Sequence, residues 1–449
     1  MPREFDVVFL GRFFLPTGPE NCCVGVRDGR IVKIARQLAA DYTLDFGHYL
    51  VLPGAVDTHV HFRDPGLTHK EDVKTGSTAA VYGGTTTVLD MPNTDPPVRT
   101  HSHLKAKWQA LRDRSLVDIG LFCEAAPQTD FEKASQLACG FKVYLGPTTG
   151  ERGFRSLEES RPVVGAALQS GRPVSVHAED PSLLVSRRGG ATGLADHAGD
   201  RPADAESNAI SWLSENFDTR GMNIAHVSSA AGLAAAEASH FLGTLEATPH
   251  HMLLDVEVTG LARPSHGKVN PPLRSKADRE AVMAAVRSGK AAIMATDHAP
   301  HTQEEKAAEF AKAPSGVPGV ETMLPLMMAL GFYRQLDMQR VVDACCRLPA
   351  ERYGLPKGKI AEGYDADFAV FDPRDVKRVR PEALHSKCGW SPFGGLFAVF
   401  PVAVFLRGDE IMGDGQIRPA RPPGQLLRPA APSAPEEGEP AEPDAHSEE

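Results

Sequence analysis

The feature that most constrains this chain is the pair His59 and His61, which follows an apolar, turn-marked stretch over residues 50–56. If residues 55–61 form a strand, the two side chains point to the same face of the sheet, because strand side chains alternate with a period of two. Two imidazoles side by side at a strand end provide half of a tetrahedral zinc site. Two histidines that merely share a strand face give the same pattern, so the pair alone leaves both interpretations open.

Three later segments repeat one format, a short apolar run that ends in a potential metal ligand; these ligands are His177, His226 and Asp297. A further apolar segment, residues 140–145, carries the single lysine Lys142. A lysine at such a position can snorkel to water. Fully buried lysines are rare unless they are paired or modified. Beside four histidines and an aspartate on similar strand ends, the pattern favours a lysine that carbon dioxide converts to a carbamate, which can bridge two metal ions.

Ligands on widely separated strand ends predict one architecture, a (β/α)8 barrel. In this fold the catalytic groups come from the C-terminal ends of several strands and converge on one face. Helical patterns separate the candidate strands, at residues 103–114, 157–169, 203–216 and 275–289. The distance from residue 57 to residue 297 is about the length that eight strands with their helices require.

The chain resembles the dihydroorotases of the amidohydrolase superfamily. The resemblance rests on four segments that occur in the family's order over residues 5–414: Asp57-Thr58-His59-Val60-His61-Phe62-Arg63-Asp64-Pro65-Gly66, Asp90-Met91-Pro92-Asn93-Thr94, Lys268-Val269-Asn270-Pro271-Pro272-Leu273-Arg274 and Thr296-Asp297-His298-Ala299-Pro300-His301. Hydantoinases and allantoinases share the metal ligands. They typically lack an arginine at the position of Arg63 and the form of turn that this chain has at Asn93. The resemblance implies reversible, zinc-dependent hydrolysis of the cyclic amide dihydroorotate to N-carbamoyl aspartate, in pyrimidine biosynthesis.

The resemblance also implies two zinc ions for each subunit. One ion would bind His59, His61, Lys142 and Asp297, and the other would bind Lys142, His177 and His226, with Lys142 carboxylated. Imidazole and carboxylate ligands suit zinc. Asp297 would serve in addition as the catalytic base and then acid. His298 and His250 are expected to play structural or supporting roles.

Substrate binding requires other groups, because dihydroorotate carries a carboxylate. Arg63 offers a planar fork of donors for that carboxylate, and its alternative role is a surface salt bridge with Asp64 or Asp72. The resemblance assigns further substrate contacts to Asn93 and His301. Asn93 also suits a tight turn, which does not exclude a substrate contact. Asn270, and Pro318 and Gly319 on the loop over residues 315–319, complete the predicted substrate-binding residues.

Two other functions fit parts of the sequence. A hydantoinase or allantoinase would share the metal site, but a neutral ring would not need Arg63. A catalytically inactive barrel that serves as a scaffold would be expected to lose metal ligands, whereas this chain keeps a candidate at all six positions.

The composition limits the possible partners. The chain has 449 residues, 42% of them hydrophobic, which is enough for a large core and an accessory domain. Its formal net charge is -10, so no basic field predicts nucleic acid binding. No apolar run is long enough for a membrane helix, and the N-terminus has no signal-peptide pattern. Seven cysteines without CxxC spacing indicate reduced thiols and a cytoplasmic protein. The predicted partner is a small-molecule substrate, and a homodimer is the candidate assembly.

The pattern along the chain predicts four parts. Strand-like residues at 5–14, 24–35, 365–372 and 401–408 predict a small β-sandwich domain built from both chain ends. Its first part is residues 1–50 and its second part is residues 356–416, with the barrel at residues 51–355 between them. Residues 417–449 form a predicted disordered tail, because residues 431–449 hold seven acidic side chains, several prolines and no lysine or arginine.

Overall fold

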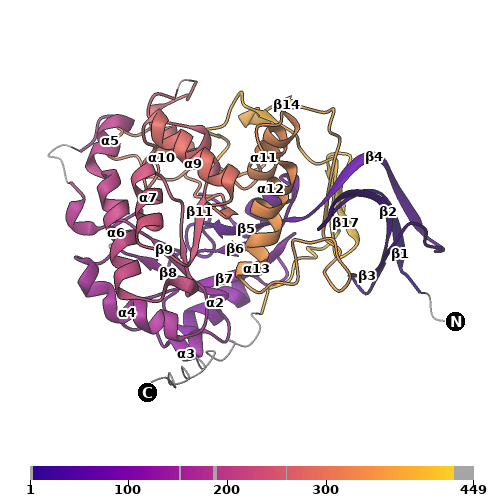
Figure 1. Ribbon diagram of the computed structural model, residues 1–449, viewed down its shortest axis with the longest axis horizontal. Helices are drawn as coiled ribbons and strands as arrows, with labels where there is room; N and C mark the ends of the chain where they lie inside the picture. Colours follow the sequence, from indigo (N-terminus) through magenta and orange to yellow (C-terminus); the bar gives the residue numbers. More distant parts are fainter. Residues whose placement is uncertain (1–3, 151–152, 186–189, 259, 429–449) are drawn as a thin grey trace, which may run out of the picture.

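The computed structural model describes residues 4–150, 153–185, 190–258 and 260–428. Two bodies lie side by side, a barrel surrounded by helices and a separate curved sheet that holds the start of the chain (Figure 1). Of the predicted tail over residues 417–449, residues 429–449 lie outside the described residues. The described part is ordered against the barrel, because the Leu427 N–H donates to the Ile119 carbonyl oxygen at 2.8 Å, so the tail begins later than predicted. Among the described helices, none has both the length and the apolar character that a membrane crossing requires.

Eight parallel strands form the barrel, and they neighbour one another in the order of the chain. They are β5 (Ala55–Val60), β6 (Thr85–Asp90), β7 (Asp118–Glu124), β8 (Gly140–Tyr144), β9 (Val174–His177), β10 (Met222–Ile224), β11 (Thr244–Ala247) and β12 (Ile293–Met294). A parallel bridge between Val60 and His298, with a hydrogen bond from the His61 N–H to the His298 carbonyl oxygen of 2.8 Å, brings the last strand next to the first. The predicted (β/α)8 barrel is therefore confirmed.

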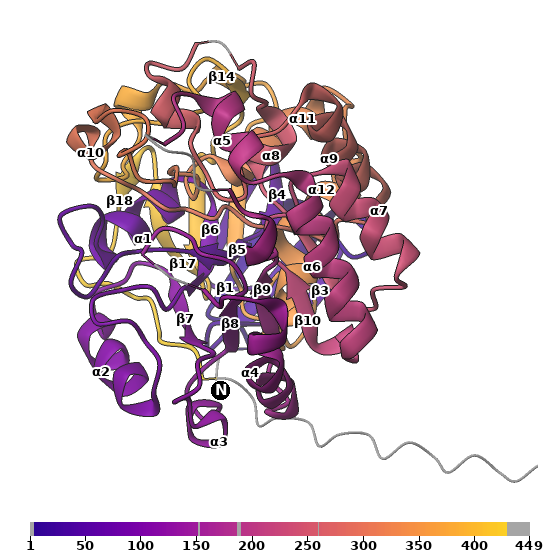
Figure 2. The same cartoon turned by 90° about the vertical axis from the view of Figure 1, so that its left-hand side faces the viewer.

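Helices cover the outside of the barrel (Figure 2). They are α1 (Val73–Tyr82), α2 (His101–Leu111), α3 (Phe131–Ala134), α4 (Leu157–Gln169), α5 (Leu194–Asp200), α6 (Ala203–Asn216), α7 (Ala230–Ala238), α8 (Pro249–Leu253), α9 (Lys276–Ser288), α10 (Gln303–Ala307), α11 (Met323–Phe332), α12 (Met338–Val342) and α13 (Leu348–Arg352). Helices α4 and α6 have the predicted bounds, and the predicted ends of α9 are its caps, Ser275 and Gly289. Helix α2 starts two residues earlier than predicted, because the Thr100 side chain accepts a hydrogen bond from the His103 N–H and caps it.

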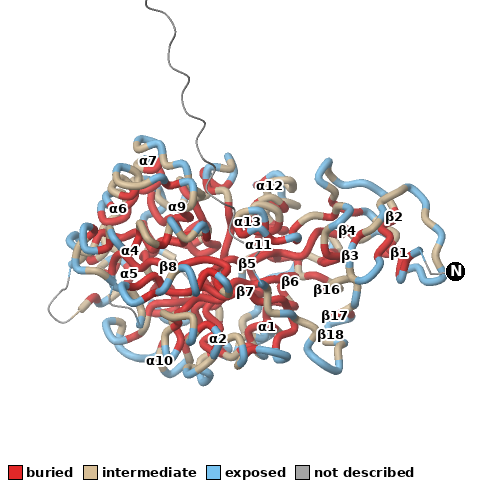
Figure 3. Tube along the Cα trace, turned by 90° about the horizontal axis from the view of Figure 1, so that it is seen from below, coloured by how far each residue is buried: buried red, intermediate tan, exposed pale blue. Residues whose placement is uncertain are grey.

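The barrel strands are buried on both faces, as parallel strands between helices must be. Every residue of β5, β6 and β7 is buried. Figure 3 shows the buried segments concentrated along these central strands, with exposed segments at the periphery. The polar side chains at the ends of these strands are therefore removed from water by the fold itself, which makes their partners decisive.

The second body is one eight-stranded sheet with strands from both ends of the chain, in the order β18-β17-β16-β13-β4-β1-β2-β3. Its strands are β1 (Val7–Leu15), β2 (Gly18–Arg27), β3 (Arg30–Ala35), β4 (Thr43–Pro53), β13 (Phe368–Phe371), β16 (Ala403–Leu406), β17 (Asp409–Gly413) and β18 (Gln416–Ile417), and a separate pair is formed by β14 (Lys377–Arg378) and β15 (Phe397–Ala398). The predicted discontinuous sheet domain is confirmed. Strand β4 extends to Pro53, and the exact domain limits stay a prediction.

The curvature of this sheet explains its core. Strands β1 and β16 are three strand positions apart, which is about 14 Å in a flat sheet. Nevertheless, the rings of Phe9 on β1 and Phe405 on β16 have centroids only 5.3 Å apart. The sheet therefore closes over an aromatic core, in the manner of a small sandwich.

Candidate active site

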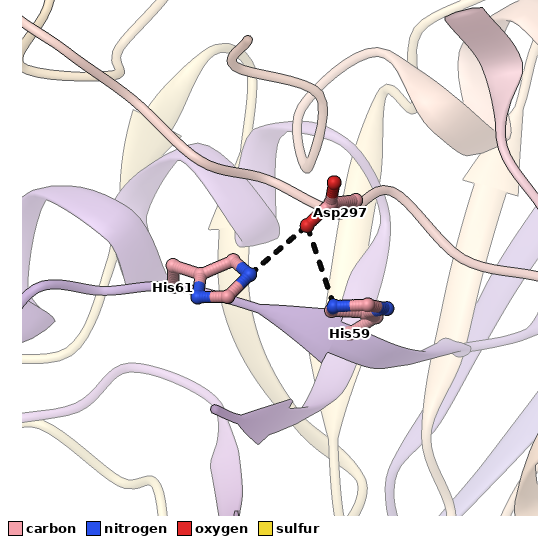
Figure 4. A group of neighbouring side chains, drawn as sticks. All are labelled: His59, His61 and Asp297. Carbon is pink, nitrogen blue, oxygen red and sulfur yellow. Dashed lines mark hydrogen bonds and ion pairs between the residues drawn. The ribbon is translucent and has the colours of Figure 1, made fainter. Parts of the chain in front are cut away.

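His59 and His61 face the carboxylate of Asp297 (Figure 4). His59 lies on β5 and His61 follows it, while Asp297 comes shortly after β12 at the other side of the barrel closure. The Asp297 Oδ1 atom lies 2.9 Å from His61 Nε2 and 3.3 Å from His59 Nε2. Both rings thus point to one face, as the alternation along the strand predicts.

The other three predicted ligands lie at the ends of neighbouring strands. Lys142 on β8 has its Nζ atom 3.4 Å from His59 Nε2. His177 ends β9 and His226 follows β10, and their Nδ1 and Nε2 atoms are 3.1 Å apart. All six predicted ligands line one pocket of about 400 Å³.

The spacing of these atoms suits bound metal ions. With zinc–nitrogen bonds of about 2.05 Å, two ligand atoms of a tetrahedral site lie about 3.3 Å apart. The four separations given above range from 2.9 Å to 3.4 Å. Imidazole nitrogens this close together do not stabilise one another, because their lone pairs point at the same centre. A set of imidazole and carboxylate ligands around one centre suits a divalent cation.

Acidic side chains behind the histidines orient the rings. The His59 Nδ1–H group donates to Glu246 Oε1 at 2.9 Å, and the His177 Nε2–H group donates to Glu179 Oε2 at 2.6 Å. Arg201 pairs with Glu179 on its other side. Such partners set the tautomer and leave the opposite nitrogen free for a metal. The sequence interpretation missed these three residues, although Glu246 within the apolar strand β11 and Glu179 two residues after His177 were available signals.

Burial lowers the pKa of two of the pocket imidazoles. It lowers the pKa of His61 to about 4 and lowers the pKa of His226 well below its usual value. Burial alone would raise the pKa of Asp297, but the charges and hydrogen bonds of the surrounding histidines lower it well below the normal range. Burial also lowers the pKa of Lys142 to about 8. Neutral imidazoles and an ionised carboxylate are the forms that bind metal.

Arg63 is buried in the same pocket and is 3% exposed. Its Nε–H group donates to the Pro300 carbonyl oxygen at 3.4 Å. The carboxylates proposed for a surface salt bridge have other partners, since Asp64 pairs with Arg114 and Asp72 pairs with Lys387. Within the described ranges Arg63 has no carboxylate at ion-pair distance, so the surface salt bridge is wrong and the guanidinium faces the pocket unneutralised.

The remaining predicted substrate residues differ in their positions. Asn93 and Asn270 line the pocket; Asn93 Oδ1 accepts a hydrogen bond from His61 Nδ1, and Asn270 Oδ1 accepts one from His197 Nε2 at 2.9 Å. His301 lies behind Arg63, with its Nε2 atom 3.4 Å from Arg63 Nη2.

The loop over residues 315–319 lines the pocket through a different part than predicted. Ser315 and Gly316 line it, whereas Pro318 and Gly319 are absent from the lining. Gly319 instead donates its N–H to His298 Nδ1 at 3.0 Å. Residue 317 forms a parallel bridge with His298, which turns the end of the loop toward the barrel wall. His298 itself thus has the supporting position that was expected for it.

Three pocket residues have left-handed backbone conformations that non-glycine residues seldom adopt. The φ angles are 60° at Arg63, 41° at His226 and 46° at Asp297. Each lies just beyond the end of a barrel strand, where the chain must turn away from the barrel axis. Backbone strain of this kind is concentrated at functional sites, which supports a functional reading of this pocket.

The comparisons with known proteins agree with this geometry. The model of the amidohydrolase family matches residues 50–409. The dihydroorotase of Halobacterium salinarum is 39% identical over 81% of this chain and 86% of its own length, and that of Thermoplasma acidophilum is 36% identical over 91% and 94%. Among solved structures, the L-hydantoinase (dihydropyrimidinase) of Arthrobacter aurescens superimposes with a TM-score of 0.86 at 26% identity, covering 94% of this chain and all of its own.

A matching family model over most of the chain and relatives above one-third identity over most of both lengths lead to one conclusion. The chain belongs to the amidohydrolase family and, within that family, to the dihydroorotases.

Proposed function

We propose that this protein is a metal-dependent dihydroorotase, which interconverts dihydroorotate and N-carbamoyl aspartate. The observation that carries the proposal is the buried, unneutralised guanidinium of Arg63 beside the histidine and aspartate cluster. A buried cation is costly unless an anion joins it. The carboxylate of dihydroorotate supplies that anion and accepts two parallel hydrogen bonds from the guanidinium fork.

We propose two zinc ions as the cofactor, held by His59, His61, Asp297, His177 and His226 around Lys142. Lys142 is 1% exposed, and in the described chain its Nζ atom has no carboxylate at ion-pair distance. Carboxylation of Nζ would replace a buried cation with an anion that two metal ions can share, which removes the cost of burying an unpaired ammonium group. Bound zinc would lower the pKa of a water molecule and polarise the amide carbonyl group.

Asp297 is the residue proposed to move the proton. It takes a proton from the attacking water as the carbon–oxygen bond forms, and delivers it to the ring nitrogen as the carbon–nitrogen bond breaks. The left-handed backbone at Asp297 directs its carboxylate toward both histidines, so that it stays ionised until the reaction begins. Arg63 and Asn93 hold the substrate while this proton moves.

The competing activity is that of a hydantoinase or allantoinase. The solved hydantoinase structures share the fold, and their identity to this chain is 26% or lower, below that of the dihydroorotase relatives. A neutral hydantoin ring would leave Arg63 without an anion. A scaffold without activity is less well supported, because all six ligand side chains line one pocket.

The test is an assay of L-dihydroorotate, hydantoin and allantoin side by side, with Arg63→Met. Loss of a charge-assisted contact in a desolvated pocket costs on the order of 2–5 kcal/mol. We therefore expect kcat/KM for dihydroorotate to fall by about 30-fold to 4,000-fold with the metal content unchanged. Arg63→Lys should recover part of the loss, because an ammonium group lacks the planar fork.

Arg114→Met is the matched control, since Arg114 pairs with Asp64 outside the pocket and is 44% exposed. It should leave kcat/KM within about twofold of the wild type, because exposed ion pairs contribute little. Preference of the wild-type protein for a neutral ring, or equal losses for charged and neutral substrates in Arg63→Met, would refute the proposal.

The cellular setting remains a prediction. All seven cysteines are free, and six of them are buried. Free thiols suit a reducing compartment, so we infer a cytoplasmic location. Size-exclusion chromatography with light scattering would test the predicted homodimer.

A further inference from the structure

Two lysines are buried beside the active-site pocket without an acidic partner. Lys306 on α10 is 0% exposed and Lys268 is 8% exposed. In the part of the chain that the structure describes, neither amino group has a carboxylate at ion-pair distance, and both bind backbone carbonyl oxygens instead. A buried lysine that serves only carbonyl groups must be holding a particular backbone conformation.

Lys306 binds backbone carbonyl groups on both sides of Ser315, which lines the pocket. Its Nζ atom donates to the carbonyl oxygens of Pro314 and Gly316, each at 2.9 Å. Burial lowers the pKa of Lys306 to about 7, and both the ammonium and the amine form keep at least two N–H groups for these two acceptors. Lys268 contributes from the other side, because its carbonyl oxygen accepts the Gly316 N–H at 2.9 Å.

The Ser315 carbonyl group lies between those of Pro314 and Gly316, and it faces His301 instead of Lys306. Ser315 lies in a bend, and Gly316 after it has a φ angle of 138°. The Ser315 carbonyl oxygen lies 3.1 Å from His301 Nε2 and accepts a hydrogen bond from Thr149 Oγ1 at 3.0 Å. Gly316 lies so close that an added Cβ would come within 3.0 Å of His301 Nε2. The loop therefore presses the Ser315 carbonyl against the His301 ring.

The neighbours of His301 determine where its proton lies. Two groups with opposite demands lie beside Nε2: the Ser315 carbonyl oxygen at 3.1 Å can only accept, and Arg63 Nη2 at 3.4 Å can only donate. The carbonyl contact is the shorter of the two, and it requires the proton on Nε2. At the other nitrogen, Lys70 Nζ lies 3.3 Å from Nδ1 and can only donate. Glu305 Oε2 is farther from Nδ1, at 3.5 Å, and Glu305 pairs with Lys70 at 2.7 Å. These contacts select the neutral ring with the proton on Nε2.

Lys306 also contacts Trp390, which binds the backbone of His301. The Trp390 Nε1–H group donates to the His301 carbonyl oxygen at 2.8 Å, and Lys306 Nζ packs 5.3 Å from the centre of the Trp390 ring. His301 is thus held at its ring by the Ser315 carbonyl and at its backbone by Trp390. Lys306 contacts the Trp390 ring and the carbonyl groups on either side of Ser315.

We propose that Lys306 is a positioning residue of the active site: it holds the carbonyl groups of Pro314 and Gly316, and so directs the Ser315 carbonyl to keep the His301 proton on Nε2. Lys306 touches neither metal ligands nor substrate. Its effect on the substrate rests on the proposed function, because His301 lies against Arg63, which would receive the carboxylate. The tautomer itself does not rest on that function.

The first test is a long-range ¹H–¹⁵N correlation spectrum of the zinc-loaded protein labelled with ¹⁵N-histidine. The His301 signals are identified by their loss in His301→Asn. We expect a protonated Nε2 and an unprotonated Nδ1 in the wild-type protein at neutral pH. A ring protonated on Nδ1 alone, or on both nitrogens, would overturn the proposal without any assay of activity.

The second test compares Lys306→Met with Lys312→Met, a control on the same loop whose lysine is 75% exposed and pairs with Glu309. In Lys306→Met we expect the His301 tautomer signal to shift or to average. We also expect KM for L-dihydroorotate to rise by about tenfold with kcat within about twofold, because carboxylate binding acts on ground and transition states alike. Lys312→Met should change neither readout.

Lys306→Arg keeps N–H donors and should recover the tautomer signal in part, which also tests the role if Lys306→Met does not fold. A folded Lys306→Met protein with unchanged His301 signals and unchanged KM would refute the proposal. A wild-type protein that leaves L-dihydroorotate intact would refute the proposed function alone, since the spectrum of His301 decides the role of Lys306 independently.

Discussion

Two buried clusters of acidic and basic groups lie at opposite ends of the barrel, and each has the spacing of a metal site. At the C-terminal ends of the strands, Asp297 faces His59 and His61. At the start of β7, Asp118 meets Asp365 and Asp367 near the sheet domain. The two groups would be equivalent candidates if only the distances between ligand atoms were considered.

They differ in the source of the positive charge. The aspartate cluster lies at the junction of the barrel and the sheet domain. At this junction, Lys357 Nζ lies 2.7 Å to 2.8 Å from all three carboxylates, and Arg407 adds a second cation on Asp118. The three aspartates raise the pKa of Lys357 despite its burial, which alone would lower it. At the pocket, the ion-pair partners of Asp297 in the described chain are the imidazoles of His59 and His61, and burial lowers the pKa of His61 to about 4, so neither is a permanent cation like Lys357. The comparison teaches that an acidic cluster indicates a metal only when the chain does not fill it with its own cation.

The largest expected effect tests the pocket end of this comparison. His59→Ala or His61→Ala should lower turnover by at least about 1,000-fold and reduce the zinc content, because no neighbour can replace a lost ligand. His69→Ala is the control, since His69 is exposed and is not among the residues that line the pocket. Elemental analysis and an assay on the same samples check the prediction, and full activity with normal zinc in either variant would contradict it.

The next effect tests whether Lys142 acts as an anion. Lys142→Ala should be inactive and should regain part of its activity when acetate or propionate is added, because the missing group is a carboxylate. Ethylamine at equal concentration is the control and should have no effect. Rescue by the amine, or a variant that keeps both activity and metal, would show that another residue joins the two ions.

The third effect tests the junction end. Lys357→Met removes the cation that three buried carboxylates share, although Arg407 still pairs with Asp118. It should lower the free energy of unfolding by about 3–5 kcal/mol, with zinc content unchanged in the folded protein. Urea unfolding measures the loss. Lys359→Met is the matched control, two residues along, whose lysine pairs with the partly exposed Glu351. An equally stable Lys357→Met protein would mean that the junction does not need its own cation.

The smallest effect concerns pH. Protons compete with metal for the imidazoles, and a pKa of about 4 at His61 means that this competition begins at a lower pH than for an exposed histidine, whose pKa is about 6.5. Zinc should therefore remain bound at pH 6 and be lost as the pH falls toward about 4. Metal content after dialysis at each pH measures this, and half-loss of zinc near pH 6.5 would contradict it.

Local patterns predicted much of the fold. Helix α4 begins and ends where predicted, because Ser156 caps its first turn and the apolar spacing continues to its end. The strands that carry the ligands were also recognisable, since each is an apolar run that stops at a polar residue. Strand β12 spans only two residues, and its place in the barrel depends on neighbours far away in the chain.

The supporting residues of the site were harder to predict, for a physical reason. Glu246 is 187 residues from His59, so its place within the apolar strand β11 can indicate a buried carboxylate but not which imidazole that carboxylate contacts. The same holds for Ser315 and Gly316, which line the pocket where Pro318 and Gly319 were predicted. A loop's contact residues depend on the direction in which its carbonyl groups turn, and Lys306 sets that direction from another element.

The sequence by itself therefore determined which side chains stand at strand ends, because the alternation of a strand and the apolar character of a buried run are local properties. The tertiary structure alone decided which of those charges are compensated. Lys357 reaches three carboxylates from both bodies of the molecule. In the described chain Arg63 has no carboxylate at ion-pair distance, and Asp297 is paired only with imidazoles. Compensation depends on distances of a few ångströms in a low-dielectric interior, and only the folded chain defines those distances.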